Sequence, residues 1–311
     1  MTYQGKAREI INHINQFLIG KNDTAELCVI TLLAGGHLLI EDVPGVGKTT
    51  LANLLARCVD CSFMRIQFTP DTLPGDVIGM SIFNMKSSEF QFVPGAIMNH
   101  IVLVDEINRT SPKTQSALLE AMQERQVTVD KKIYPLEEPF MVIATQNPIE
   151  FIGTYNLPEA QLDRFLMKLS IGYPDFDDET KMSLNYINGH SPENANAVIQ
   201  RESLIEMRNE VKNVSLCPKI IEYIITLVAS TREHKLLALG ASPRATLALI
   251  SAAQGCAYIN KRDYVIPDDV QRMLPYVLCH RILLTAEARM NKETPEKIMK
   301  EIKNAIQVPI I

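Results

Sequence analysis

HLLIEDVPGVGKTT, residues His37–Thr50, leads from an apolar run into a glycine-rich loop that ends in a lysine and two threonines. Glycines in such a loop let backbone N–H groups face a phosphate, and the following helix adds the positive end of its dipole. We expect Lys48 to reach the β and γ phosphates of a nucleotide and Thr49 to bind Mg²⁺ through its hydroxyl. The stretch therefore predicts a Walker A loop, or P-loop, between a buried strand and a helix.

One position departs from the Walker A pattern, because Asp42 stands where the first glycine is usual. The rest of the loop still supplies the turn, the close approach to the phosphates and the positive charge. The residues predicted to contact the nucleotide are Pro44, Gly45, Val46, Gly47, Lys48, Thr49 and Thr50. A chance turn of glycines and lysine is the alternative, and the strand before it and helix after it argue against that.

A second motif ends in two carboxylates. Ile101–Glu106 (IVLVDE) is an apolar run that suits a buried strand, and ligands of parallel sheets bind at the carboxyl edge. We expect Asp105 to hold Mg²⁺, directly or through water, and Glu106 to polarise the attacking water as a general base. A lone acidic pair is usually a solvated strand end, but the preceding P-loop favours a Walker B motif.

Five short apolar runs give the first two-thirds of the chain its rhythm. They are His37–Asp42, Phe63–Phe68, His100–Asp105, Phe140–Gln146 and Met167–Gly172. Such runs suit the strands of a parallel sheet covered on both faces. Helical patterns over Thr49–Cys58 and Lys113–Arg125 lie between them. We predict an α/β fold with a five-stranded parallel sheet and helices on both faces.

The domain organisation follows from where this rhythm changes. Residues 78–93 and 127–138 each have strand-like ends around a polar turn, which is typical of projecting hairpins. The last part of the chain is helical in pattern, with Ser242 as a capping residue before a proline. The sequence thus predicts a nucleotide-binding domain over residues 1–175 and a smaller all-helical lid domain over 176–311.

Composition and charge limit the class of protein and its partners. Of the 311 residues, 46% are hydrophobic and 22% charged, as in an ordinary globular protein. The net charge of −5 makes nucleic acid an unexpected partner, because nucleic-acid binders usually carry a basic excess. The amino end does not resemble a signal peptide and no apolar run is long enough to span a membrane. We therefore expect a cytoplasmic protein.

The cysteines and histidines do not predict a metal or redox site. Cys58 and Cys61 form a C-x-x-C pair, but a second pair at zinc spacing is missing. We interpret them as ordinary reduced thiols, and the low density of cysteines fits a reducing compartment. His37 and His100 flank apolar runs, so we expect core or edge residues rather than metal ligands.

Four longer stretches carry a family resemblance. They are RIQFTPDTLPGDVIG (Arg65–Gly79), DEINRTSPKTQSALLEAMQERQVTVD (Asp105–Asp130), YPLEEPFMVIATQN (Tyr134–Asn147) and LPEAQLDRF (Leu157–Phe165). Together they resemble the MoxR family of AAA+ ATPases. The resemblance covers most of residues 15–175 and continues more weakly through the helical part. It implies that the chain binds ATP or ADP with Mg²⁺, and that the two hairpins are the helix 2 insertion and the hairpin before sensor 1.

The resemblance also assigns roles to single residues. Asn147 matches sensor 1, which would hold the attacking water, although an Asn before a proline is also a common turn residue. Arg164 matches the arginine finger, which acts on the nucleotide of a neighbouring subunit and so implies a ring. Arg244 matches sensor 2. A surface arginine is the alternative for both arginines. Gly20 lies in the stretch that the family places near the adenine.

The function that the resemblance implies is ATP hydrolysis coupled to chaperone-like work on a protein partner. That work would be maturation of a complex or insertion of a metal or cofactor, often with a von Willebrand factor A-domain partner and in a homo-oligomeric ring, expected to be a hexamer. A metal-chelatase motor subunit, a nucleotide-gated scaffold with little turnover and a nucleic-acid motor are the alternatives. Phe151-Ile152 and Asn156 depart from the family pattern between sensor 1 and the finger.

Overall fold

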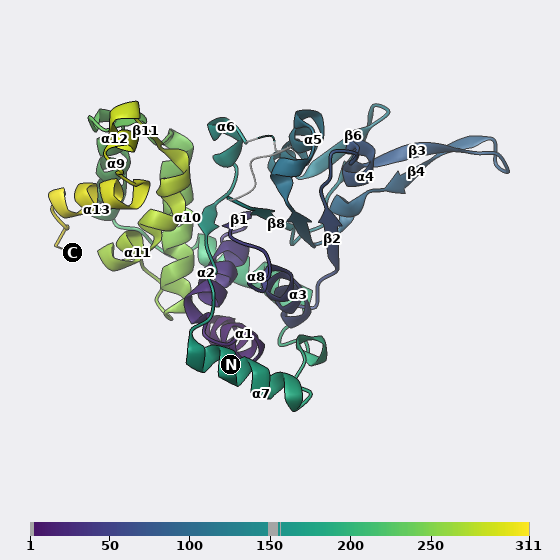
Figure 1. The fold of residues 1–311 in the computed structure, drawn as a ribbon, viewed down its shortest axis with the longest axis horizontal. Helices are drawn as coiled ribbons and strands as arrows, with labels where there is room; N and C mark the ends of the chain where they lie inside the picture. The colour runs from purple at the N-terminus through teal and green to yellow at the C-terminus, as the bar shows by residue number, and fades with distance from the viewer. Residues whose placement is uncertain (1–2, 149–154, 156, 311) are drawn as a thin grey trace.

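A five-stranded parallel sheet forms the centre of the first half of the chain (Figure 1). The computed structural model describes residues 3–148, 155 and 157–310. In spatial order the strands are β2 (Phe63–Gln67), β5 (Ile101–Asp105), β8 (Met141–Gln146), β1 (Leu38–Glu41) and β9 (Met167–Leu169). Every neighbouring pair runs parallel. These strands are the five predicted apolar runs, so the α/β fold is confirmed.

Helices cover both faces of this sheet. Successive residues of a strand point to opposite faces, so Leu38 and Ile40 enter one apolar cluster while Leu39 enters another. The first cluster also holds apolar side chains of α1 (Tyr3–Phe17), α2 (Asn22–Leu33) and α3 (Lys48–Cys58). The second holds side chains of α5 (Pro112–Glu124). Burial on both faces explains why the inner strands β1, β5 and β8 are almost continuously apolar, whereas no residue of the edge strand β2 is fully buried.

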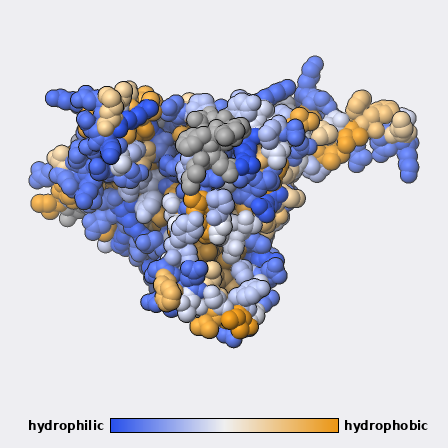
Figure 2. Space-filling view, viewed as in Figure 1, coloured by the Kyte–Doolittle hydropathy of each residue, from blue (hydrophilic) through white to orange (hydrophobic). Residues whose placement is uncertain are grey.

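Two antiparallel hairpins leave the sheet. After the short helix α4 (Pro74–Ile78), β3 (Gly79–Asn84) and β4 (Glu89–Pro94) form an arm that projects far from the body (Figure 1). The second hairpin pairs β6 (Gln126–Val129) with β7 (Lys132–Pro135). The arm carries exposed apolar side chains toward its tip (Figure 2), among them Phe83, Met85 and Phe90. The Phe92 and Tyr134 rings stack with centroids 3.9 Å apart and join the two hairpins at their bases.

The remainder of the chain is mainly helical. After α6 (Glu159–Leu162) and β9 come α7 (Phe176–Ile187), α8 (Arg201–Lys212), α9 (Pro218–Glu233), α10 (Pro243–Ile259), α11 (Pro267–Leu278), α12 (Ala286–Met290) and α13 (Pro295–Ala305). Prolines at the first helical position begin several of them, as predicted for α10. A small antiparallel pair, β10 (Leu237–Leu239) with β11 (Leu283–Leu284), adds a feature that the sequence did not predict.

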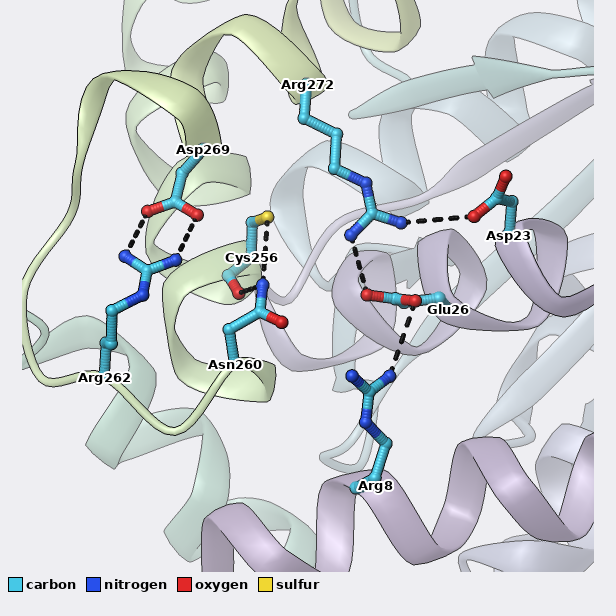
Figure 3. Close-up of polar contacts among 8 residues, drawn as sticks. All are labelled: Arg8, Asp23, Glu26, Cys256, Asn260, Arg262, Asp269 and Arg272. Carbon is cyan, nitrogen blue, oxygen red and sulfur yellow. Dashed lines mark hydrogen bonds and ion pairs between the residues drawn. The ribbon is translucent and has the colours of Figure 1, made fainter.

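The C-terminal helices share an interior with the helices behind the sheet. The larger apolar cluster runs without interruption from α1 and α2 through α8, α9, α10, α11 and α13. An ion pair reinforces the contact, since Arg272 of α11 lies 2.7 Å from Glu26 of α2 (Figure 3). The same carboxylate also lies 3.5 Å from Arg8 of α1. Among the described residues, no helix has both the length and the apolar character needed to cross a bilayer.

Candidate functional site

A cavity of about 340 Å³ lies at the carboxyl edge of the sheet. The sequence-predicted residues that line it are Pro44, Gly45, Gly47, Lys48, Thr49, Thr50, Asp105, Glu106 and Asn147. Arg65, Gln67 and Thr145 complete the lining. The loop, the acidic pair and the amide thus face one cavity although they are far apart in the sequence.

The loop between β1 and α3 has the backbone of a phosphate cradle. Gly45 (φ 86°) and Gly47 (φ 93°) both lie in the left-handed region, where a side chain would be strained. Helix α3 begins at Lys48, so its free N–H groups and the positive end of its dipole point toward the loop. The Lys48 ammonium donates to the Asp42 carbonyl at 2.9 Å, which holds the lysine across the loop. This arrangement suits a polyphosphate.

Asp42, the residue in place of the usual glycine, fastens this loop to the segment after β9. One carboxylate oxygen accepts hydrogen bonds from the Ser170 hydroxyl and from the Ile171 and Gly172 amides, at 2.8, 2.6 and 2.7 Å. The other oxygen accepts from the Val43 amide at 2.9 Å. Burial favours a raised pKa at Asp42, but these hydrogen bonds outweigh it and hold the pKa below its ordinary value. Asp42 is therefore an ionised structural tie rather than a phosphate contact.

Asp105 is the buried member of the acidic pair. Its two carboxylate oxygens have different partners: Arg65 Nε lies 2.6 Å from Oδ2, and the Thr145 hydroxyl donates to Oδ1 at 3.2 Å. Thr49 lines the same cavity and offers a hydroxyl. Mg²⁺ prefers oxygen ligands and is usually held by one or two carboxylates together with substrate phosphates, so this donor set fits it. Among the described residues, no group of three or more His, Cys, Asp or Glu forms a richer metal site.

Glu106 occupies a left-handed backbone conformation with φ 59°. Its amide donates to the Thr145 hydroxyl at 2.9 Å, so Thr145 holds both acidic residues. The carboxylate accepts from Gln67 Nε2 at 2.6 Å and lies 3.1 Å from Arg109 Nε. An unusual backbone conformation that is held by several contacts is common at functional sites. The side chain is thus fixed toward the cavity, where a general base would be needed.

Sequence reasoning missed Arg65, Gln67 and Thr145 as parts of the site. Arg65 and Gln67 alternate in the otherwise apolar run of β2, and this spacing places both on the same side of the strand. The register pairs Gln67 with Asp105, which brings that side over the acidic residues. Two polar residues two positions apart in an apolar strand were therefore a usable sign of a functional site. Only the register of β2 against β5 shows that these residues lie beside Asp105 and Glu106.

A second cavity, of about 310 Å³, adjoins the other side of the P-loop. Val46 lines this cavity, together with Gly45, Gly47 and Thr50, which also line the first. Its remaining walls come from the end of α1 and the turn after it, and from α7 and the segments on either side of α7. They are largely apolar: Phe17, Leu18, Ile19, Lys21, Pro174, Met182, Asn185, Tyr186, His190 and Pro192. A flat apolar base attached to a phosphate chain in the first cavity would fit here.

Gly20 borders this region without lining the cavity. Its φ is 73°, and a Cβ at this position would lie 1.9 Å from a carboxylate oxygen of Asp178 on α7. Glycine therefore lets the Asp178 side chain, and with it α7, pack against the turn between α1 and α2. The family resemblance predicts that Gly20 lies near the adenine base. In the structure Gly20 instead contacts α7, and residues of α7 line the second cavity.

Arg164 and Arg244 line a third cavity, of about 340 Å³, instead of the first. Gly36 and His37, which line it too, lie at the amino end of β1, whereas the P-loop follows its carboxyl end. Arg164 Nη1 donates to the Leu119 carbonyl at 2.8 Å. The structure therefore brings the two predicted arginines together, but on a different face from the acidic pair.

Asp163, next to Arg164, is held by the helical part of the chain. Its carboxylate lies 2.8 Å from Arg281 Nε and accepts from the Ser242 hydroxyl at 2.9 Å. Ser242 precedes α10 as expected, but its side chain makes no capping hydrogen bond. The loop that carries Arg164 is thereby fixed to the start of the helix that carries Arg244.

The remaining cysteine and histidine predictions concern structural residues. Burial raises the pKa of the Cys58 and Cys61 thiols to about 12, so both stay protonated near neutral pH. Burial also lowers the pKa of His37 to about 4, and its ring bonds the Met122 carbonyl and the Val142 amide. Phe151, Ile152 and Asn156, the departures noted in the sequence, lie outside the described residues.

Comparisons with known proteins place similarity along almost the whole chain. Residues 37–167 match the ATPase family associated with various cellular activities (AAA), and residues 229–302 match the AAA lid domain. YeaC of Bacillus subtilis, an uncharacterized protein, is 52% identical over 98% of this chain and 95% of its own. Chaperone MoxR1 of Mycobacterium tuberculosis is 39% identical over 96% of this chain and 81% of its own. The crystal structure of a candidate ATPase from Cytophaga hutchinsonii is 38% identical with a TM-score of 0.93, covering 99% of this chain and 96% of that one.

Proposed function

The chain belongs to the MoxR family of AAA+ ATPases, and from this premise we propose that it hydrolyses Mg²⁺-bound ATP to ADP and phosphate and thereby remodels a protein partner. The observation that carries the proposal is that the P-loop, the acidic pair and Asn147 line one cavity. The second cavity, on the other side of the P-loop, would take the adenine base.

Within the first cavity each residue has a distinct task. Lys48 and the free N–H groups of α3 hold the phosphates, and Thr49 and Asp105 supply oxygen ligands. Bound Mg²⁺ would neutralise charge on the β and γ phosphates. Glu106 accepts a proton from the attacking water, and its contacts with Gln67 and Arg109 fix its carboxylate. Asn147 orients that water from the end of β8.

The position of the two arginines supports the homo-oligomeric ring that we propose. Arg164 and Arg244 line a cavity at the opposite edge of β1 from the P-loop, so they would act on the nucleotide of a neighbouring copy. A ring in which this face meets the first cavity of the next subunit places both arginines at every nucleotide. We propose a hexamer, the ring size that the family resemblance implies.

The proposed partner is a protein. The similarity to a protein named as a chaperone supports this class of substrate. The projecting arm with its exposed apolar side chains is a surface that protein partners can use. Maturation of a complex and insertion of a metal or cofactor, with a von Willebrand factor A-domain protein as co-partner, are the specific forms that we propose. All six cysteines are free thiols, which supports a cytoplasmic location.

The domain organisation that we propose keeps the nucleotide-binding part within residues 1–175 and the lid within 176–311. The last strand of the main sheet ends at Leu169 and α7 begins at Phe176, which supports a boundary between them.

The decisive experiment is Glu106→Gln. Because the amide keeps the shape of the side chain but cannot accept the proton, the variant should bind ATP like the wild type and lose about 100-fold or more of its turnover. Calorimetric binding and steady-state phosphate release measure the two quantities. Unchanged turnover would remove Glu106 from its role, and a wild-type protein that binds ATP with negligible turnover would indicate a nucleotide-gated scaffold.

A further inference from the structure

Arg65 holds the carboxylate that the proposed function assigns to the metal. Its Nε lies 2.6 Å from Asp105 Oδ2, and the side chain of Asp105 is only 9% exposed. The other oxygen of Asp105 accepts the Thr145 hydroxyl. Both oxygens of the buried carboxylate therefore have a protein partner, and the partner of Oδ2 is a permanent cation.

We propose that Arg65 is a positioning residue that competes with Mg²⁺ for Asp105 and so sets the Mg²⁺ concentration at which the nucleotide site fills. The inference rests on the proposed nucleotide site. Mg²⁺ requires near-ideal octahedral geometry with ligands at about 2.0–2.1 Å. A guanidinium in hydrogen-bond contact with the same oxygen repels the ion and occupies one of the two lone pairs of that oxygen. Oδ2 of Asp105 therefore binds the ion more tightly once Arg65 has moved.

Arg65 has somewhere to move. Its side chain is 52% exposed and lines the cavity in which the phosphates would lie. Arginine binds phosphate oxygens as well as carboxylates, because its planar guanidinium offers donors in a fork. Mg²⁺-nucleotide binding would thus exchange an arginine–carboxylate contact for an arginine–phosphate contact. The exchange couples the nucleotide and the metal through one side chain.

A comparison within the same chain separates this contact from a structural ion pair. Arg262 donates to Asp269 at the start of α11 through two nitrogens, at 2.6 and 2.5 Å (Figure 3), and neither residue lines the nucleotide cavity. Arg65 instead uses Nε beside the nucleotide cavity. The five registered residue pairs of β2 and β5 already join the two strands, so the Arg65–Asp105 contact is not needed to close the sheet.

The test measures ADP binding by calorimetry at increasing Mg²⁺ concentrations. It compares the wild-type protein with Arg65→Ala and Arg65→Lys, each as the whole 311-residue chain. Arg65→Ala should lower the Mg²⁺ concentration at half-maximal binding by about three- to tenfold, the range expected for one partly exposed charged hydrogen bond. ADP affinity in EDTA should stay the same or fall. Arg65→Lys keeps the charge but lacks Nε, so its midpoint should lie between the other two.

Arg57→Ala is the matched control, because it removes one positive charge from α3 at a site that bonds Asn53 and the Glu193 carbonyl instead. Its Mg²⁺ midpoint should equal that of the wild type. An unchanged or higher midpoint in folded Arg65→Ala, with ADP still bound by the wild type, would overturn the inference alone. Absence of ADP binding by the wild type at every Mg²⁺ concentration would overturn the proposed function as well. If Arg65→Ala does not fold, Arg65→Gln replaces it under the same criteria.

Discussion

Asp42 shows how one side chain can replace a glycine in a nucleotide-binding loop without disturbing the loop. Its carboxylate does not line the first cavity and accepts four hydrogen bonds, three of them from residues that follow β9. The edge strand β9 is thereby tied to the P-loop. The departure from the Walker A pattern at Asp42 therefore connects the P-loop to the segment after β9 by hydrogen bonds.

Asp42→Asn should lower the free energy of unfolding by about 1–3 kcal/mol at pH 7, because an amide NH₂ would face the Ile171 and Gly172 N–H donors. Urea denaturation measures the loss. The folded-state pKa of Asp42 is lowered, so its stabilising contribution is complete above the usual carboxyl pKa of 3.8. The difference from the wild type should shrink as pH falls through the folded-state pKa. The exposed substitution Asp71→Asn is the control, and a difference that does not depend on pH would refute the assignment.

At this scale the sequence was sufficient for residues that belong to a motif. Lys48, Thr49 and the acidic pair needed only local context, and they do line one cavity. Arg65 and Thr145 could not be assigned in advance, since their partners are set by the register of β2, β5 and β8. The expected cap Ser242 bonds Asp163 instead, a tertiary contact that no local pattern records.

Among the elements, α7 is the least firmly held wall of the nucleotide region. None of its residues is fully buried, and several apolar side chains are exposed on it (Figure 2), including Phe176, Tyr186 and Ile187. Helices with little burial open readily. Helix α7 approaches the turn after α1 at Gly20, where a Cβ would meet the side chain of Asp178.

Gly20→Ala should therefore displace α7 and weaken ADP binding several-fold. Its matched control is Gly189→Ala, which has almost the same φ (74° against 73°) but no atom within 4 Å of the new Cβ. Both variants carry about 1–2 kcal/mol of backbone strain, and only the first adds a clash. Calorimetry and amide exchange across α7 measure the effect. Equal behaviour of the two variants would show that strain alone, rather than the position of α7, is responsible.

The elements themselves were largely predictable. Each strand of the main sheet lies within its predicted apolar run. For β1, β5 and β8 the reason is burial on both faces, which leaves a strong signal in the sequence. The pair β10 and β11 was missed because its strands have only three and two residues, too few for any periodicity. The pairing order of the main sheet also had no local signal.

For the whole molecule, the proposed assembly predicts complementation between two inactive variants. Arg164→Ala lacks the finger and Glu106→Gln lacks the base, so each alone should have little ATPase activity. In a randomly mixed ring, about a quarter of the interfaces would join an intact Glu106 to an intact Arg164 of the next subunit. Phosphate release from remixed subunits should recover to a comparable fraction of the wild type. No recovery, with assembly confirmed by sedimentation, would mean that Arg164 does not act across subunits.

The uninterrupted apolar interior affects how a truncated form of this protein would behave during expression. A fragment that stops near residue 175 would keep every strand of the nucleotide-binding sheet. It would, however, expose Ile30, Leu33 and their neighbours on α2 to solvent, because the C-terminal helices that pack in the same apolar cluster would be missing. Such a product should come out of expression as insoluble material rather than as a minimal ATPase. Soluble expression would require either the intact chain or polar substitutions on the exposed apolar face of α2.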